Sequence, residues 1–226
     1  MTAPDGPPIR EAASLILLRR GPAGPAVLMG MRGQGAAFMP SKFVFPGGAV
    51  DAGDAGIPLA RPLPEPHRRR LTVEPGPHDP DAIAAAGLRE LAEETGLLIG
   101  RPGSGGPAGF AGAGLRPDAG GLVYLFRAIT PPGRPRRFDA HFFLADAADV
   151  AGDPDDFGAA CDELSHLHWV ALAEARRLDL PFITEVVLAE LAALVEGLAP
   201  DAPLPVPASV PFFDNRGARP RFVQID

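Results

Sequence analysis

Apolar residues form several short runs that are typical of β-strands. Two runs, Ala12 to Arg19 and Ala26 to Met31, flank the turn-forming segment Gly21-Pro22-Ala23-Gly24-Pro25, and this pattern predicts a β-hairpin. The remaining strands are expected at Phe43 to Phe45, Leu97 to Ile99, Leu122 to Ile129, Phe138 to Leu144 and Leu164 to Val170.

Fewer segments have a helical pattern. Asp79-Pro80-Asp81 places an acid near an N-cap and a proline in the first turn, and Gly96 is a stop signal, so a helix is predicted from about Pro80 to Thr95. A short helix is expected over Leu172 to Leu178 and a longer one over Pro181 to Leu198. Strands mixed with few helices, in an order that does not alternate strictly, predict an α/β fold with a mixed sheet between helices.

Glycine and proline set the irregular parts of the chain. With 27 Gly and 28 Pro among 226 residues, part of the chain is expected to be irregular. Gly56 to Pro80 and Gly100 to Gly121 lack periodic apolar spacing and are predicted to be long loops. We expect a single domain over residues 1–226, with an insertion at about 55–80 and a Pro-rich tail from about residue 200. Phe212-Phe213 and Phe222 indicate that this tail is docked.

Net charge and cysteine content limit the binding partners and the cellular compartment that fit this sequence. The net charge of −7 argues against nucleic-acid binding, which normally leaves a basic footprint. Cys161 is the only cysteine, so the sequence predicts no internal disulfide and no cysteine-based zinc cluster, as in a reducing cytoplasm. No apolar run has the length of a membrane span or a signal peptide, so a cytoplasmic protein without a membrane partner is expected.

Three carboxylates are placed where a helix alone would not favour them. Glu90, Glu93 and Glu94 lie at i, i+3 and i+4 just before Gly96. Like charges at these spacings repel, and anions in the last turn oppose the helix macrodipole. A bound Mg²⁺ or Mn²⁺ would explain the cluster, because both cations take oxygen ligands; a solvated acidic face is the alternative.

The segment Arg89-Glu90-Leu91-Ala92-Glu93-Glu94-Thr95-Gly96-Leu97 resembles the second half of the Nudix box, the signature of Nudix hydrolases. Phe45 to Asp54 resembles the front half, with Gly48 followed six positions later by Asp54 where the family has Glu. Thirty-four residues, 55 to 88, separate the two halves, where the family has seven. When seven residues, 82 to 88, are left between Arg89 and the acid, the position falls on Asp81, so Asp54 and Asp81 both remain candidates for the missing Glu.

The resemblance implies an α/β/α sandwich with a mixed sheet, and a set of site residues. Glu90 and Glu94 would be the principal ligands of Mg²⁺ or Mn²⁺, Glu93 would help through the metals or their waters, and the Gly48 carbonyl would complete the shell. Arg89 would orient the carboxylates, and its i,i+4 spacing to Glu93 permits a salt bridge. The metal ions would neutralise a diphosphate and lower the pKa of an attacking water.

The remaining site residues have open assignments. Family members differ in the general base, so Glu90, Glu93 and Glu163 are all candidates, and Glu163 could equally be a surface acid at a strand start. Arg136 and Arg137 are candidate substrate-binding residues, since their guanidinium forks could clamp phosphates; edge charges on a loop are the alternative.

The substrate expected from the resemblance is a small nucleoside diphosphate derivative cleaved at its P–O–P bond. The split box, together with Phe38 to Gly48 and Arg136 to Leu144, is similar to the Nudix subfamily typified by the peroxisomal acyl-CoA diphosphatase, which suggests CoA or acyl-CoA. ADP-ribose, NADH or a nucleotide sugar is the alternative, and a catalytically silent Nudix-fold ligand-binding or regulatory module is a third reading. Because many Nudix proteins are dimers, a homodimer is also expected.

Overall fold

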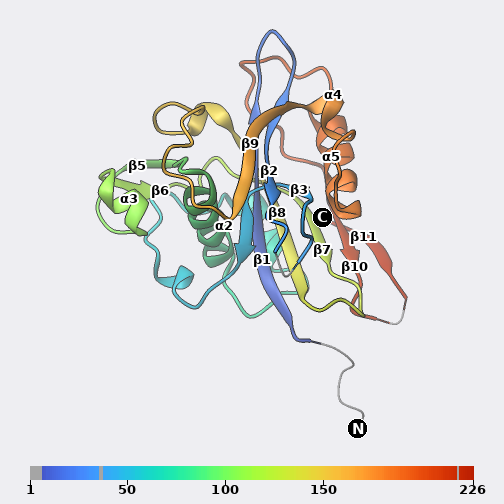
Figure 1. Cartoon of the computed structure of the whole chain (residues 1–226). Coiled ribbons are helices and arrows are strands. Elements are labelled where there is room, and N and C mark those ends of the chain that lie inside the picture. The colour runs from blue at the N-terminus through green and yellow to red at the C-terminus, as the bar shows by residue number, and fades with distance from the viewer. Residues whose placement is uncertain (1–6, 36–37, 218) are drawn as a thin grey trace.

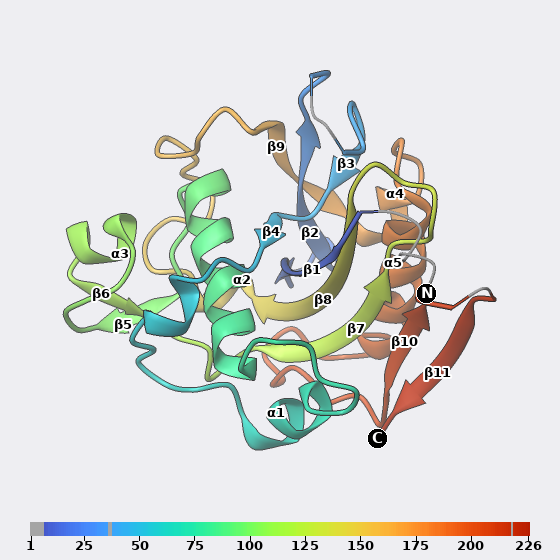
Figure 2. The same ribbon diagram turned by 90° about the horizontal axis from the view of Figure 1, so that it is seen from below.

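One mixed sheet lies between two helical layers in the computed structural model, which describes residues 7–35, 38–217 and 219–226. Nine strands of this described chain form the sheet, in the order β11-β10-β7-β8-β1-β2-β3, with β4 paired to β1 and β9 paired to β2. Helix α2 covers one face, and helices α4 and α5 cover the other (Figures 1 and 2). This arrangement confirms the α/β fold with a mixed sheet that the sequence predicts.

The bounds of the elements follow chain order. The strands are β1 (Ile9–Arg19), β2 (Ala26–Arg32), β3 (Phe43–Val44), β4 (Gly47–Ala49), β5 (Gly100–Pro102), β6 (Leu115–Pro117), β7 (Val123–Ile129), β8 (Arg137–Asp146), β9 (Leu164–Ala171), β10 (Val210–Asp214) and β11 (Arg221–Ile225). The helices are α1 (Glu65–Leu71), α2 (Pro80–Thr95), α3 (Ala108–Gly112), α4 (Leu172–Ala175) and α5 (Phe182–Leu194), with 3₁₀ turns η1 (Asp54–Gly56) and η2 (Ala147–Asp149).

The predicted long helix is confirmed as α2. The Asp79 carboxylate accepts a hydrogen bond from the Asp81 amide at 2.9 Å, Pro80 begins the helix, and Gly96 ends it at φ 77°. This left-handed conformation favours glycine, since a Cβ there would be strained. The caps therefore fix both ends of the helix that carries the three carboxylates.

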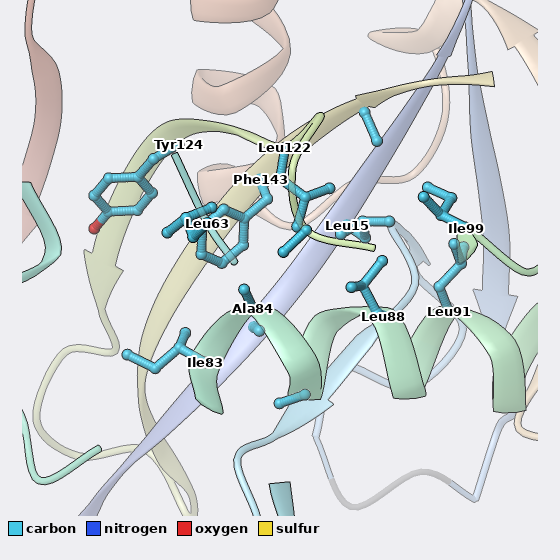
Figure 3. Packing of buried hydrophobic residues seen from close by; sticks show 14 of the residues in the cluster. Leu15, Leu63, Ile83, Ala84, Leu88, Leu91, Ile99, Leu122, Tyr124 and Phe143 are labelled. Atoms are coloured by element: carbon cyan, nitrogen blue, oxygen red, sulfur yellow. The ribbon is translucent and has the colours of Figure 1, made fainter. Parts of the chain in front are cut away.

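Two separate apolar clusters lie on opposite faces of the sheet. Leu88 and Leu91 of α2 point toward Leu15 of β1 and its neighbours in the sheet (Figure 3). On the opposite face, Val187 and Leu191 of α5 pack into a second cluster. Among the described residues, no helix combines the length and apolar character needed to cross a membrane.

The expected strand at Leu97 to Ile99 is wrong. Ile99 makes only an isolated antiparallel bridge to Val150. Leu97 and Ile99 are apolar because they pack in the core below α2, where each is only 3% exposed, and not because they form a ladder of strand hydrogen bonds.

The two predicted long loops contain regular elements. The insertion holds η1 and α1, and residues 100–121 hold α3 and the small β5–β6 sheet. Helix α1 escapes sequence analysis because two of its three buried positions are His67 and Arg70. Apolar periodicity cannot reveal a helix whose buried face is partly polar.

The Pro-rich segment from residue 200 is docked, as Phe212, Phe213 and Phe222 indicated, but it is not irregular throughout. Strands β10 and β11 form an antiparallel hairpin, and β10 pairs in parallel with β7 through Phe212 and Phe213. Phe212 is 1% exposed, and its ring lies 4.4 Å from the Arg127 guanidinium carbon. The hairpin therefore extends the central sheet past β7.

Buried charges connect the insertion to the sheet. Arg127 of β7 forms a bidentate pair with Asp139 of β8, at 2.8 and 2.7 Å, and donates to the carbonyls of Val73 and Glu74 at 3.1 and 3.0 Å. Arg216, which follows β10, forms an ion pair with the Glu74 carboxylate. Residues 73 and 74 are thus bound both to the sheet and to the segment after β10.

We expect Phe212→Ala to lower the free energy of unfolding by about 3–5 kcal/mol, because it removes a buried ring and leaves a cavity over Arg127. Phe222→Ala is the matched control on the same hairpin, since Phe222 is 54% exposed, and it should cost about 1 kcal/mol or less. Urea unfolding of both variants measures the difference. Equal losses would show that the hairpin does not add buried packing to the sheet.

Candidate active site

Glu94 is the most deeply buried carboxylate of the predicted cluster. It is 1% exposed, and its Oε2 accepts a hydrogen bond from the Gly47 amide at 2.8 Å. Its Oε1 is shielded from solvent and has no partner in the described chain. Burial raises the pKa of Glu94 to about 8, and the charges of Glu90 and Glu163 add to the effect. A buried carboxylate oxygen of this kind calls for a cation.

Glu90 lies against strand β4 with no room for a side chain between them. A Cβ atom added to Gly48 would come 2.4 Å from both Cδ and Oε1 of Glu90. Burial also raises the pKa of Glu90, although the Arg89 charge opposes this shift. Gly48 is therefore required here because it lets the strand backbone approach the carboxylate closely.

Glu93 points to a more open environment than its two neighbours. Its side chain is 54% exposed, and its Oε2 lies 3.3 Å from Nη1 of Arg89, which is the i,i+4 pair that the sequence permits. A cavity of about 550 Å³ adjoins Glu93, Arg89 and Asp54. Of the three carboxylates, Glu93 thus has the greatest freedom to reorient.

Arg89 holds the site together. Its Nε and Nη2 donate to Oδ1 and Oδ2 of Asp54 at 2.8 and 3.0 Å, and Nη2 also donates to the Ala49 carbonyl at 3.1 Å. Its Nη1 donates to Glu90 Oε1 at 2.7 Å. Hydrogen bonding to Asp54 raises the pKa of the Arg89 guanidinium further above its usual range. The expected contact of Arg89 with the carboxylates is present.

The structure separates the two candidates for the missing box Glu. Asp54 is buried and lies in the Arg89 network, where it also accepts from the Asp51 amide at 2.8 Å. Asp81 instead accepts from the Leu63 amide at 3.0 Å and forms an ion pair with Arg68. Asp54 therefore occupies the site, and Asp81 helps to attach the insertion to the start of α2.

Glu163 comes within electrostatic reach of the cluster, on the segment that leads into β9. Its charge contributes to the raised pKa values of Glu90 and Glu94. Its Oε1 lies 2.8 Å from Nη2 of Arg32, a residue that sequence analysis missed. A polar residue closing the apolar run of β2 was the available signal, but its meaning depends on the pairing of β2 with β9.

Arg136 and Arg137 do not form a pair of free guanidinium groups. Arg137 is buried, and it donates to the carbonyls of Thr130 and Asn215, both at 3.0 Å. Arg136 is exposed on the loop before β8. The backbone contacts explain why Arg137 is buried, and a part for either residue in substrate binding stays a prediction.

The donor set fits a hard divalent cation. The unpartnered Glu94 Oε1 and the Glu90 carboxylate against Gly48 supply anionic oxygens, which Mg²⁺ and Mn²⁺ prefer. Within the described ranges, no three His, Cys, Asp or Glu side chains already converge on one metal position. Glu90 and Glu93 both contact Nη1 of Arg89 instead. Ligation of a metal by Glu90, Glu93, Glu94 and the Gly48 carbonyl therefore stays a prediction.

Known proteins resemble this chain in sequence and in structure. No protein-family model matches it. It is 29% identical over 178 residues to nudix hydrolase 7 of Caenorhabditis elegans, covering 71% of this chain and 51% of that protein, so the chain spans about half the length of this curated relative. The crystal structure of a NUDIX hydrolase from Alicyclobacillus acidocaldarius is 31% identical, with a TM-score of 0.62, over 86% of this chain and 94% of the other.

A mixed sheet between helical layers, with a carboxylate-bearing helix packed on a Gly-Gly strand, defines an α/β protein of the Nudix fold class. The chain belongs to the Nudix hydrolase family, because it is 31% identical to a member of which it covers 94%. The resemblance of the two box halves is thereby confirmed at the level of the family.

The raised pKa of Glu94 predicts a pH dependence of stability in the metal-free protein. Between the ordinary value of 4.5 and about 8, the folded protein keeps a proton that the unfolded chain loses. The free energy of unfolding should therefore fall as pH rises through this window, by up to about 1.4 kcal/mol per pH unit. Glu94→Gln cannot titrate and should lack this component. Urea unfolding in EDTA at about pH 5.5 and about pH 7.5 measures it, and parallel profiles would contradict the assignment.

Gly48→Ala should lower the free energy of unfolding by about 1–3 kcal/mol, because the new Cβ forces the Glu90 carboxylate or strand β4 to move. Gly53→Ala provides the control, since a Cβ at Gly53 meets nothing within 4 Å and its φ of −73° suits any residue. Thermal and urea melts of both variants give the comparison. A Gly48→Ala protein as stable as the control would mean that the close approach is not required.

Proposed function

We propose that this chain is a divalent-metal-dependent hydrolase that cleaves the P–O–P bond of a nucleoside diphosphate derivative. The observation that supports the proposal most strongly is the buried, unpartnered Oε1 of Glu94 beside the Glu90 carboxylate. Two anionic groups in a poorly solvated site are costly unless a cation joins them. Membership of the Nudix hydrolase family supports the same reaction.

Glu90 and Glu94 would hold Mg²⁺ or Mn²⁺ in this proposal, together with the Gly48 carbonyl, and Glu93 would assist. The bound metal would neutralise the diphosphate and lower the pKa of a water molecule. Arg89 keeps Glu90 in place from one side and is itself fixed by Asp54. Glu90, Glu93 and Glu163 remain the candidates for the group that accepts the proton of the water.

Within this reaction, we take CoA or an acyl-CoA as the first substrate class. The support is the split box and the two flanking segments that resemble the acyl-CoA diphosphatase subfamily. These segments meet in the structure, because the rings of Phe38 and Phe138 pack edge to face with centroids 5.2 Å apart. The contact is consistent with the two segments acting as one unit next to the site.

The test is hydrolysis of CoA, acetyl-CoA, ADP-ribose, NADH and diadenosine polyphosphates with Mg²⁺ or Mn²⁺, followed by chromatography. We expect cleavage of at least one compound, and of CoA or acetyl-CoA first, with loss of activity in EDTA. Glu94→Gln should lower kcat/KM by more than about a hundredfold, beyond the range typical of residues that only support metal ligands.

Glu196→Gln is the matched control for this variant, since it removes the same charge at an exposed position after α5, and it should keep full activity. Undiminished cleavage in EDTA, or undiminished cleavage by Glu94→Gln, would contradict the metal-dependent mechanism. Metal binding without cleavage of any compound would instead favour a Nudix-fold binding module.

A further inference from the structure

Arg32 is a positively charged residue near the carboxylate cluster, and the proposed reaction has so far given it no role. It ends strand β2, where its backbone amide donates to the Lys42 carbonyl and its own carbonyl accepts from the Ser41 amide, both at 3.0 Å. Across the sheet it is in register with Leu164 of β9. The Arg32 backbone is therefore fixed on both sides, so its side chain extends from a rigid part of the sheet.

The contacts of the Arg32 guanidinium leave part of its donor capacity unused. Its Nη2 donates to Glu163 Oε1 at 2.8 Å. Its Nε is shielded from solvent and has no hydrogen-bond partner in the described chain. An unsatisfied buried donor on a charged group destabilises the folded state. The ion pair to Glu163, whose side chain is 54% exposed, offsets little of this penalty because solvent screens it. The fold alone does not explain why an arginine is kept there.

The position of Arg32 suits an anion that also touches the metal-binding carboxylates. The segment before β9 lies against the C-terminal end of α2, because the Cys161 amide donates to the Glu93 carbonyl at 3.0 Å. Two residues further on, Glu163 contacts the Arg32 guanidinium, which places Arg32 near this end of the helix. A diphosphate bridging from a cation at Glu90 and Glu94 would therefore come within the electrostatic reach of Arg32. A guanidinium binds phosphate oxygens with two parallel N–H donors, whereas its present contact to Glu163 uses one.

We propose that Arg32 binds the diphosphate group of the substrate, and that Glu163 holds the Arg32 guanidinium in place until that group arrives. This inference rests on the proposed function and adds a residue to its substrate-binding site. Exchange of the Glu163 carboxylate for phosphate satisfies more of the Arg32 donors. It also releases Glu163 beside the carboxylate cluster at the moment when the substrate is bound.

The probe for a test is imidodiphosphate, a diphosphate analogue that resists hydrolysis, titrated with Mg²⁺ into the full chain by calorimetry. Arg32→Gln should weaken binding at least about tenfold, equivalent to about 1.4 kcal/mol. Arg32→Lys, which keeps the charge but loses the fork, should give an intermediate affinity. Glu163→Gln should bind the probe more tightly than the unaltered protein, because it frees Arg32, whereas loss of a merely structural ion pair would leave the affinity unchanged.

Arg19→Gln is the matched control, since Arg19 also forms a single 2.8 Å ion pair with an exposed acid, Asp155, and it should leave the affinity unchanged. Thermal melts show whether each variant is folded. If Arg32→Gln does not fold, the affinity of Arg32→Lys for the probe tests the proposal in its place. Equal affinity of the Arg32 variants and the unaltered protein, or no binding of the probe by the unaltered protein, would overturn the proposal. Because the probe is not cleaved, these outcomes are independent of whether any compound is hydrolysed.

Discussion

The fork of Arg89 is the interaction on which the site depends. It joins two segments separated by thirty-four residues, since one edge binds both oxygens of Asp54 and the other contacts Glu90 and Glu93. A lysine could not span these partners, because its ammonium is a point charge without a planar fork. The same guanidinium reaches the Ala49 carbonyl, so α2 is held against β4 at the spacing that leaves no room for a side chain at Gly48.

The insertion is attached at both ends without disturbing this contact. It begins after Asp54, which belongs to the Arg89 network, and it ends at Asp79, which caps α2 and pairs with Arg68 at 3.0 Å. Near its C-terminal end, the His78 amide and ring both contact the buried Glu11 carboxylate of β1. The insertion therefore leaves and rejoins the domain at charged residues with fixed partners. Between these ends, residues 73 and 74 are bound to Arg127 of the sheet.

Local signals in the sequence were sufficient for some elements and not for others. The bounds of α2 follow from Asp79, Pro80 and Gly96, and the first hairpin follows from its glycines and prolines, because caps and turns are short-range features. Helix α1 could not be predicted, since His67 and Arg70 fill its buried face. The Pro-rich composition around β10 and β11 likewise hid two strands whose pairing depends on β7, far away in the sequence.

In the candidate site, too, some residues could be predicted from local sequence patterns and others could not. The spacing of Glu90, Glu93 and Glu94 is visible in one helix, whereas the choice of Asp54 over Asp81 depends on which carboxylate reaches Arg89. Arg32 and Glu163 are brought together by the pairing of β2 with β9, across 131 positions of sequence. No local pattern encodes such a contact, because it is created by strand register.

The parallel pairing of β10 with β7 also has a consequence for how the chain folds. Residues 123–129 are made long before residues 210–214, and until the latter arrive, one edge of β7 presents unpaired backbone groups and Phe212 does not cover Arg127. Contacts across such sequence distances slow folding, because a long loop must close before they form. During synthesis the nascent sheet therefore carries an open edge at β7, which is a template for pairing with another chain until β10 docks.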